Sequence, residues 1–338
     1  MIMMKRYKKI LLTGVLSALS CSFVHAQELY KNENAPVHER VMDLISRLTV
    51  EEKISLLRAT SPGIPRLGID KYYHGNEALH GVVRPGRFTV FPQAIGLAAT
   101  WNPELQKRVA TVISDEARAR WNELDQGREQ KEQFSDVLTF WSPTVNMARD
   151  PRWGRGQETW GEDPYLTTRM GVAVVRGMQG PADAKYDKTH ACAKHYAVHS
   201  GPEAKRHSFD VENLEPRDLW ETYLPAFKAL VQEADVKEVM CAYQRFEGEP
   251  CCGSNRLLTQ ILRDEWGYKH LVVSDCGAIS DFFYQGRHET HPDAATSSAS
   301  AVINGTDLEC GVEYAHLDEA VERGSVSYTH LTLPTTER

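Results

Sequence analysis

Residues 270–279 read HLVVSDCGAI, and this stretch decides the fold. Its first half is an apolar run of the length expected for a buried strand. Asp275 follows directly, and Gly277 allows the chain to turn away from the strand. A carboxylate at the end of a barrel strand lies where an enzyme needs a nucleophile, although an aspartate in that place could equally cap a helix.

The same order of elements recurs on both sides of this stretch, because short apolar runs alternate with longer amphipathic ones. The predicted strands are residues 137–145, 190–196, 238–243, 270–273 and 301–308. The predicted helices are residues 103–124, 164–178, 216–232 and 256–265. Residues 37–57 predict one or two further helices, with a capping box of Thr49 and Glu52. This alternation is typical of parallel βα units, so the sequence predicts an α/β fold of the (β/α)8 TIM-like barrel type.

Polar side chains directly follow the predicted strands. They are residues 149–155, Lys194, His195, Tyr243, Asp275 and Asp307. In a (β/α)8 barrel the carboxyl ends of the strands meet at one mouth, where active sites form. We therefore expect these side chains to converge on one substrate.

The composition is that of an ordinary globular enzyme. Of 338 residues, 41% are hydrophobic and 25% are charged, and no internal repeat or low-complexity segment interrupts them. The net charge of −7 leaves no basic surface of the kind that binds nucleic acid. We therefore expect no nucleic-acid partner.

A metal-dependent hydrolase on the same barrel is a competing hypothesis, because the chain contains 13 histidines. Such an enzyme would carry clustered His and Asp ligands at its strand ends. His195 and His199 are four residues apart, but they lie across a predicted strand end rather than on one helical face. The sequence therefore favours a site without a metal or another cofactor.

The first 26 residues are predicted to be a secretory signal rather than part of the fold. A positively charged segment precedes an apolar one over residues 10–24, and residues 24–26 read VHA, a small-residue cleavage pattern. The apolar segment is too short to span a bilayer. Cys21 suggests a lipoprotein, but Ala18 stands where a lipobox has leucine, which favours a cleaved signal. We expect export, to the periplasm of a bacterium, and no membrane span.

Six of the seven cysteines lie after this predicted signal. None forms a C-x-x-C pair, which argues against a zinc ribbon or a thioredoxin-like site. Cys192, Cys241, Cys276 and Cys310 lie in or beside predicted strands, where cysteine behaves as a small hydrophobic residue. Export would permit disulfides, but the sequence assigns none.

Two further segments carry residues suited to chemistry. Residues 142–164 read SPTVNMARDPRWGRGQETWGEDP, which is too rich in charged and aromatic residues for a core and suits a polar pocket. The alternative is that its charges only pair with one another. Residues 191–207 read ACAKHYAVHSGPEAKRH and place Lys194 and His195 at a strand end, where both can donate hydrogen bonds to sugar hydroxyls.

Together these three segments resemble family 3 of the glycoside hydrolases, over roughly residues 38–324. The resemblance implies an N-terminal (β/α)8 barrel whose nucleophile is Asp275, in a VVSDxGA-like motif. It also matches the family's RDPRWGRxxExxGEDP motif, its Lys-His pair and its VMxAY run. The substrate-binding residues that it implies are Glu77, Arg155, Lys194, His195, Met240 and Tyr243.

The sugar that the resemblance implies depends on residues 75–82, GNEALHGV. Family members with NEALHG include many β-xylosidases and α-arabinofuranosidases, whereas many β-glucosidases carry Asp where Glu77 stands. The longer Glu77 would crowd the space beside C5 that the CH2OH of glucose needs, which favours a β-xylosidase. A β-glucosidase is the alternative, because His74 and Gly75 stand where a Trp is usual and could reopen room for a hexose.

The resemblance implies hydrolysis with retention of configuration, in which Asp275 attacks the anomeric carbon of a terminal β-linked sugar of an oligosaccharide. A second carboxylic acid protonates the leaving oxygen and then activates water. We expect Glu158, Glu162 and Asp163 to have structural pairing roles instead. The family's N-acetylglucosaminidases use a histidine within KHFPGHG, which is not expected where residues 194–201 read KHYAVHSG.

In family 3 the acid/base commonly lies in a C-terminal α/β sandwich domain, and we expect this chain to end before that domain. The predicted parts are a signal peptide over residues 1–26, a barrel domain over residues 27–324, and a non-native or disordered tail over residues 325–338. The tail continues no periodic pattern. The alternative to an active enzyme is therefore a sugar-binding fragment with little turnover.

Overall fold

The computed structural model describes residues 28–84, 86–125 and 138–331. The predicted signal peptide lies outside these residues, so its role stays a prediction. Within the described part of the chain, no helix is both long enough and apolar enough to cross a membrane.

Contacts divide the chain into two units, Met1–Leu44 and Ile45–Arg338. In the first unit, a 3-10 turn η1 (Leu29–Lys31) precedes helix α1 (Val37–Arg47), which begins in this unit. The Nε of Arg40 donates a hydrogen bond to the backbone oxygen of Tyr30 at 3.0 Å, within the same unit. The second unit holds every residue of the candidate site.

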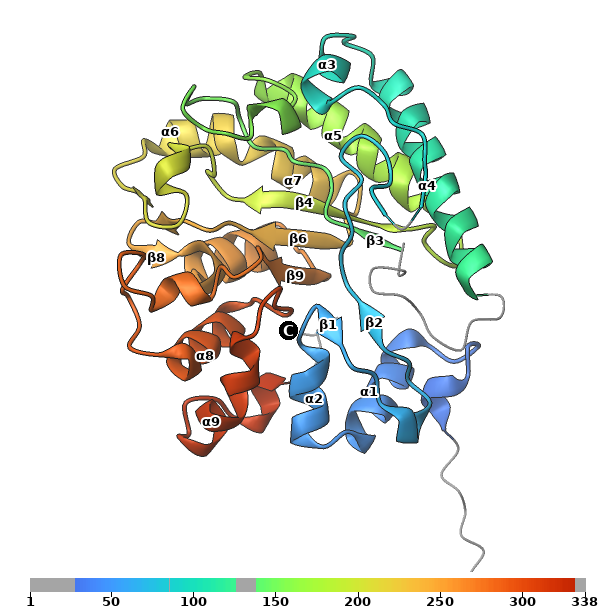
Figure 1. The fold of residues 1–338 in the computed structure, drawn as a ribbon, viewed down its shortest axis with the longest axis vertical. Coiled ribbons are helices and arrows are strands. Elements are labelled where there is room, and N and C mark those ends of the chain that lie inside the picture. Colours follow the sequence, from blue (N-terminus) through green and yellow to red (C-terminus); the bar gives the residue numbers. More distant parts are fainter. Residues whose placement is uncertain (1–27, 85, 126–137, 332–338) are drawn as a thin grey trace, which may run out of the picture. The chain divides into compact units, whose positions relative to one another are not determined.

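A parallel sheet forms the centre of the second unit (Figure 1). Its strands, in spatial order, are β3 (Thr139–Phe140), β4 (His190–Tyr196), β6 (Glu238–Cys241) and β9 (Leu271–Ser274). In the register of the sheet, Lys194 lies opposite Met240, and Met240 lies opposite Val273. Four of the five predicted strands are thereby confirmed, although β3 and β6 are shorter than predicted.

Single bridges continue this sheet on both sides until it closes. The bridged pairs are Val273 with Leu308, Glu309 with Arg58, and Asn76 with Phe140. Strand β1 (Thr60–Ser61) follows Arg58, strand β2 (Tyr72–Tyr73) precedes Asn76, and the two strands pair with each other. The pairing therefore runs round a ring, which is the barrel that the sequence predicts.

The barrel departs from a regular (β/α)8 pattern at β1 and β2, which are antiparallel. Residues 62–71 connect them through one 3-10 turn, η2 (Pro65–Leu67). A parallel connection needs a crossover of about a dozen residues or more, usually with a helix. The connection is too short for such a crossover, so the second strand returns in the opposite direction.

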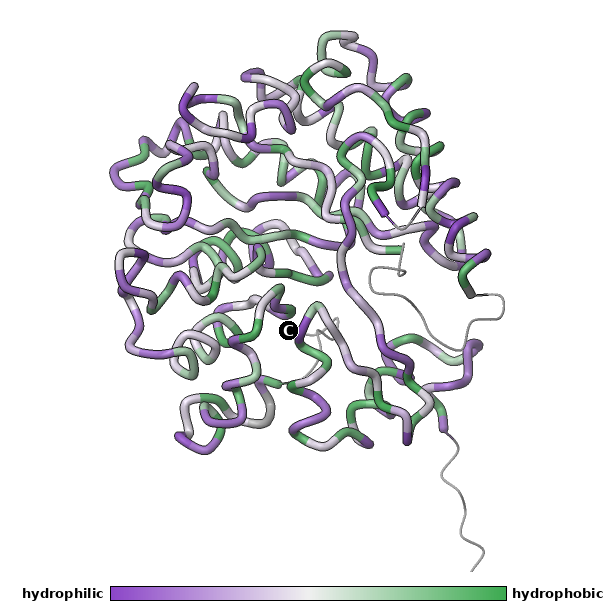
Figure 2. The backbone as a smooth tube through the Cα atoms, viewed as in Figure 1, coloured by the Kyte–Doolittle hydropathy of each residue, from purple (hydrophilic) through white to green (hydrophobic). Residues whose placement is uncertain are grey.

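Helices cover the outside of the ring, and α4, α5 and α7 lie along one side of the sheet (Figure 1). The α-helices of the second unit after α1 are α2 (Val50–Leu56), α3 (Ala94–Ala98), α4 (Pro103–Asp125), α5 (Pro164–Gln179), α6 (Pro216–Asp218), α7 (Pro225–Gln232), α8 (Ala294–Asn304) and α9 (Leu317–Glu322). Hydrophilic and hydrophobic positions alternate along α4, as expected of a helix with one buried face (Figure 2). The predicted capping box is confirmed at α2, where Thr49 and Glu52 each accept a hydrogen bond from the other's backbone N–H.

Two predicted elements have different boundaries in the structure. The strand predicted over residues 301–308 is wrong at its start, because α8 continues to Asn304 and Gly305 ends it with a φ of 112°. An apolar run alone does not distinguish a buried strand from a buried helix. The helix predicted over residues 216–232 is divided into α6, a π-helical turn η5 (Leu219–Tyr223) and α7, because Pro225 has no N–H to donate.

The last predicted helix is a π-helix, η7 (Asn255–Glu265), which follows a 3-10 turn, η6 (Cys251–Gly253). A small sheet precedes them, formed by β5 (Asp210–Val211), β7 (Arg245–Phe246) and β8 (Glu249–Pro250). Within the predicted tail, Val326 and Leu331 pack in the hydrophobic core. Whether residues 325–338 are native sequence stays a prediction.

One buried cluster fills the interior of the ring. Its members are Ala59, Trp141, Cys192, Met240, Val273 and Leu308. Each residue comes from a different segment of the ring, so the barrel is packed rather than open along its axis. The candidate site lies above this layer, where β4, β6 and β9 end.

Candidate active site

Asp275 is the first residue after β9, and only 7% of its surface is exposed. Its Oδ1 accepts a hydrogen bond from the backbone N–H of Cys276 at 2.8 Å, so this carboxylate does not cap a helix. Among the described residues, its Oδ2 has no hydrogen-bond partner. The structure thus places at the mouth of the barrel a buried carboxylate with one oxygen that accepts no hydrogen bond from the described residues, although the Tyr243 hydroxyl lies close enough to lower the pKa of Asp275.

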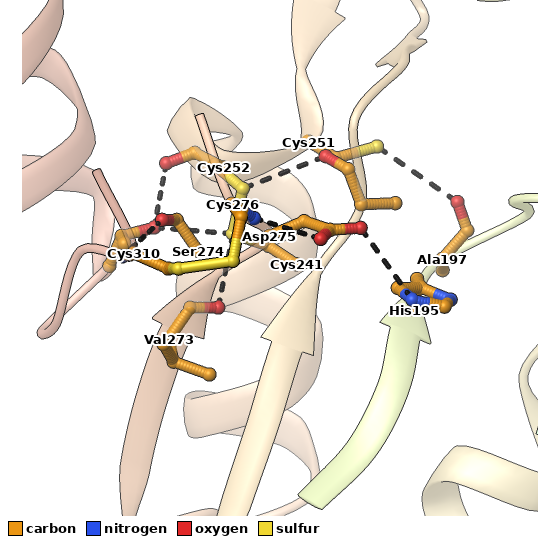
Figure 3. The surroundings of a disulfide bond; sticks show 12 residues. His195, Ala197, Cys241, Cys251, Cys252, Val273, Ser274, Asp275, Cys276 and Cys310 are labelled. Carbon is orange, nitrogen blue, oxygen red and sulfur yellow. Dashed lines mark hydrogen bonds and ion pairs between the residues drawn. A yellow bond between two sulfur atoms is a disulfide. The ribbon is translucent and has the colours of Figure 1, made fainter. Parts of the chain in front are cut away.

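His195 faces this free oxygen (Figure 3). Its Nε2 lies 3.6 Å from Asp275 Oδ2, and its side chain is buried near the end of β4. Burial, and then the positive charges of Arg155 and Lys194, hold the pKa of His195 well below its ordinary value. The imidazole is therefore neutral near neutral pH.

The same two cations act on Asp275. Burial raises the pKa of Asp275, whereas the charges of Arg155 and Lys194 lower it. Burial has the larger effect, so the net shift is upward. The cations therefore favour the ionised nucleophile without cancelling the cost of burying its charge.

Lys194 reaches across the mouth to Glu77. Its Nζ donates to Oε1 and Oε2 of Glu77 at 3.0 and 3.1 Å, from β4 to the loop that follows β2. Burial raises the pKa of Glu77, and Lys194 opposes that shift. The structure therefore brings two of the predicted sugar-binding residues together as an ion pair.

Arg155 is held by a second carboxylate of the predicted motif. Its Nε and Nη2 donate to the two carboxylate oxygens of Glu158 at 2.8 and 2.9 Å. Thr144 Oγ1 donates a further bond to Glu158 at 3.1 Å. Although burial opposes ionisation, these bonds hold the pKa of Glu158 below its ordinary value. The predicted pairing role of Glu158 is confirmed. Asp163 instead caps α5 by accepting from the backbone N–H of Leu166, and the role of Glu162 stays a prediction.

Tyr243 lies at the same mouth, two residues after β6. Its hydroxyl donates to the backbone oxygen of Cys276 at 2.9 Å, next to Asp275. Burial, and then the negative charge of Asp275, raise the pKa of Tyr243. Met240 lies deeper, in the cluster that fills the barrel interior, and the structure does not bring it to the polar group around Asp275.

Asp307, which the sequence places at the mouth, is also separate from this group. Its Oδ2 accepts from Arg263 Nη2 at 2.6 Å and from the backbone N–H of Val272 at 2.8 Å. Val272 is inside β9 rather than at its carboxyl end. Asp307 therefore fastens the last segment of the ring to β9.

Two disulfides correct the interpretation of the cysteines as small hydrophobic residues. Cys276 is bonded to Cys310, and Cys241 is bonded to Cys252, as Figure 3 shows beside Asp275. The interpretation holds for Cys192, which is free and buried, as is Cys251. The first disulfide ties the residue after the nucleophile to the segment that follows Leu308.

Two residues of the site, Asn146 and Gln244, do not stand out in the sequence, and a third, His199, stands out only as a candidate metal ligand. Asn146 makes three hydrogen bonds to His195, and Gln244 makes one to His199. Asn146 lies within the charged motif of residues 142–164, where an uncharged amide gives little signal. His199 is buried 5.2 Å from His195, measured between ring centroids. Across the residues that the structure describes, no three His, Cys, Asp or Glu side chains gather as metal ligands.

A groove elsewhere on the surface does not include these residues. It has a volume of about 610 Å³ and lies between α5 and α7, lined by residues that include Tyr165, Trp220 and Lys228. The groove contains none of the sugar-binding residues that the sequence predicts. The geometry around Asp275, rather than this groove, carries the chemistry.

Comparison with known proteins agrees with this site. The sequence model of the family described as "Glycosyl hydrolase family 3 N terminal domain" matches residues 66–335. A "Xylan 1,4-beta-xylosidase" of Xylanibacter ruminicola is 55% identical over 300 residues, which are 88% of this chain and 35% of that protein.

Two solved structures have the same fold. One is a family 3 exo-β-xylosidase in complex with a xylobiose aziridine probe, with a TM-score of 0.80 and 31% identity over 91% of this chain and 40% of the other. The other is a family 3 β-glucosidase of Bifidobacterium adolescentis, with a TM-score of 0.67 and 30% identity over 85% of this chain and 38% of the other.

This chain therefore spans between about a third and two fifths of the length of these relatives. The match to the family covers most of the chain, including β4, β6, β9 and Asp275. The chain belongs to glycoside hydrolase family 3 and carries the N-terminal domain of that family.

Proposed function

We propose that this chain is the barrel domain of a retaining exo-acting β-glycosidase that removes terminal β-linked sugars from oligosaccharides. The observation that carries the proposal is the free Oδ2 of Asp275, buried at the mouth of the barrel. An oxygen that accepts no hydrogen bond keeps all its lone pairs available for attack. His195 Nε2 faces this oxygen at 3.6 Å, and the positive charges of Arg155 and Lys194 favour the ionised form of Asp275.

The reaction then takes two steps. In the first, Asp275 Oδ2 bonds to the anomeric carbon, the bond from that carbon to the leaving oxygen breaks, and a carboxylic acid gives the leaving oxygen its proton. In the second, the acid/base group, now a carboxylate, takes a proton from water, and the water oxygen replaces Asp275 at the anomeric carbon. Two inversions give net retention of configuration.

The carboxylates next to Asp275 are poorly suited to act as the acid/base. Glu77 is paired with Lys194, and Glu158 is paired with Arg155. Both oxygens of each carboxylate accept a hydrogen bond from a cation, so neither presents an O–H to a leaving oxygen. Because the chain spans only part of its relatives, we propose that the acid/base comes from sequence outside this domain.

A β-xyloside is the substrate that the site favours. Lys194 holds both carboxylate oxygens of Glu77. We propose that this longer side chain thereby stays in the space that a hexose CH2OH would need. Gly75 does not reopen that space, since a Cβ added at Gly75 would lie 2.1 Å from the ring of Trp141. Trp141 therefore fills the space beside Gly75. The similarity to a xylan xylosidase supports the same substrate.

A β-glucosidase is the second candidate, because a solved structure with 30% identity bears that name. We also propose, from the first 26 residues, that the protein is exported to the periplasm. Hydrolysis of p-nitrophenyl β-xyloside and β-glucoside by the protein encoded by the complete locus tests the activity. NMR spectra recorded during the first turnovers should show β-xylose before the anomers equilibrate, and initial release of α-xylose would rule out retention.

A further inference from the structure

The side-chain amide of Asn146 makes two hydrogen bonds to the backbone of His195. Asn146 Oδ1 accepts from the backbone N–H of His195 at 2.8 Å, and Asn146 Nδ2 donates to the backbone oxygen of His195 at 2.8 Å. An amide oxygen only accepts and an amide nitrogen only donates. The two backbone groups therefore fix which end of the Asn146 side chain is oxygen.

The ring of His195 touches the same oxygen. His195 Nδ1 lies 3.1 Å from Asn146 Oδ1, and both side chains are buried. Because Oδ1 has no hydrogen to give, Nδ1 must carry the proton. In the neutral ring the other nitrogen, Nε2, then carries a lone pair, and this is the nitrogen that lies 3.6 Å from Asp275 Oδ2.

The charges around His195 keep the ring in this neutral form. Arg155 comes from the loop after β3, Lys194 from β4, and Arg206 and the neutral His199 from the segment after β4. The three cations disfavour a second proton on His195, and Asp275, after β9, is the facing anion. Burial acts in the same direction as the cations, because it penalises an imidazolium ion.

The same arrangement of a side-chain amide and a histidine ring recurs at His199. Gln244 Nε2 donates to the backbone oxygen of Ala197 at 2.7 Å, which leaves Gln244 Oε1 as the acceptor facing His199 Nδ1 at 2.7 Å. His199 Nε2 is buried and has no hydrogen-bond partner among the described residues. Two amides thus select the same tautomer in two adjacent histidines.

We propose that Asn146 is a positioning residue that fixes the tautomer of His195, so that His195 Nε2 accepts a hydrogen bond from a sugar hydroxyl beside Asp275. The inference rests on the proposed glycosidase function. It reverses the expectation that His195 donates to the sugar. His195 Nε2 and Asp275 Oδ2 are 3.6 Å apart, beyond hydrogen-bond distance of each other.

The tautomer can be measured without any turnover. In ¹⁵N-histidine-labelled protein, two-bond ¹H–¹⁵N spectra distinguish a protonated ring nitrogen from one with a lone pair. The signals of His195 are those that disappear in His195→Gln. We expect a protonated Nδ1 and an unprotonated Nε2, and a protonated Nε2 in the neutral ring would overturn the proposal.

Asn146→Asp tests the consequence for catalysis, because it replaces the amide with an anion of the same shape. The anion raises the pKa of His195, so the ring gains a second proton on acidification and Nε2 becomes a donor to Asp275. We expect kcat/KM to fall by on the order of 100-fold at pH 5 and to recover to within about tenfold of wild type at pH 8.

The double variant Asn146→Asp/His195→Gln is the matched control. Without an imidazole, the new loss of activity at low pH should be absent, and its persistence would show that the introduced carboxylate itself or general damage causes the loss. A uniform decrease in Asn146→Asp at all pH values would assign Asn146 a structural role only. Inactivity of the wild-type protein would count against the glycosidase function, while the NMR result would still decide the tautomer.

Discussion

Lys194 Nζ donates hydrogen bonds to both carboxylate oxygens of Glu77, at 3.0 and 3.1 Å, across the mouth of the barrel. The Lys194 side chain is 3% exposed and that of Glu77 is 32% exposed. Only Lys194 is buried, so removing Glu77 would leave a buried ammonium without its counterion, which is costly. The pair therefore holds Glu77 in place.

Glu77→Asp tests whether this carboxylate selects a pentose. The shorter side chain leaves the charge but vacates space beside C5 of the sugar, so activity on the glucoside should rise relative to the xyloside. A pocket that differs by about one methylene group discriminates by roughly 10–200-fold, and we expect the ratio of kcat/KM values to change within that range. Steady-state rates on p-nitrophenyl β-xyloside and β-glucoside measure it.

Glu77→Gln is the matched control, because it keeps the length of the side chain and removes its charge. It should lower kcat/KM on both substrates without changing their ratio much. A wild-type protein that already prefers the glucoside would show that Glu77 does not select by size, and the β-glucosidase alternative would then stand.

Asp275→Asn tests the nucleophile. An amide fills the same volume but cannot form a glycosyl ester, so turnover should be lost while sugar binding persists. After inactivation of the wild-type protein by a 2-fluoro xyloside, mass spectrometry should find the label on the peptide that contains Asp275. Labelling of another carboxylate, such as Glu158, would remove Asp275 from this role.

The sequence predicts the elements that local pattern determines. Strand β4 has the predicted bounds, since its apolar run is short and polar residues follow it at once. The run before Leu308 is ambiguous, because Ala301 and Val302 fit a buried helix as well as a buried strand. Only the packing of α8 decides between them.

The contacts within the site depend on residues that are distant in sequence. Asn146 and His195 are 49 residues apart, and the cysteines of the disulfide beside Asp275 are 34 apart. No spacing rule relates such residues, because the fold alone brings β3, β4 and β9 together. The resemblance of motifs located the site, whereas its pairing partners required the structure.

The disulfide between Cys276 and Cys310 should support both stability and rate. It closes a loop of 34 residues, which in the chain-entropy description stabilises the fold by about 4 kcal/mol. It also ties down the residue whose backbone N–H holds Asp275 Oδ1. We expect Cys276→Ser/Cys310→Ser to lower Tm and to lower kcat by on the order of tenfold or more, because small displacements of a nucleophile are costly.

Cys241→Ser/Cys252→Ser is the control for this pair. That disulfide closes a shorter loop, with a sequence separation of 11 between its cysteines. Neither cysteine adjoins Asp275 in the chain, and Cys241 contacts it only through its backbone oxygen, which accepts from the Asp275 N–H at 3.2 Å. This variant should lose stability yet keep most of its kcat at temperatures where it stays folded. Equal loss of kcat in both double variants would show that general stability, rather than the position of Asp275, explains the effect.

Glu238 should make stability depend on pH. It is the first residue of β6, is 2% exposed, and has one carboxylate oxygen without a hydrogen-bond partner among the described residues. Burial raises its pKa from 4.5 to about 8, although Trp141 opposes the shift. The folded protein therefore keeps a proton that the unfolded chain releases.

Between pH 4.5 and about 8, Glu238 therefore contributes stability that is lost as pH rises. The slope from one such group is at most about 1.4 kcal/mol per pH unit. Glu238→Gln removes the proton exchange and keeps the shape of the side chain. The difference in unfolding free energy between Glu238→Gln and wild type should thus shift in favour of the variant by a few kcal/mol from pH 5 to pH 8.

Guanidinium unfolding at both pH values measures this difference, with the exposed Glu265→Gln as a control that should show no such trend. A difference that does not change with pH would mean that Glu238 is ionised in the folded protein, and its burial would then have to be balanced by a partner that the structure does not place there.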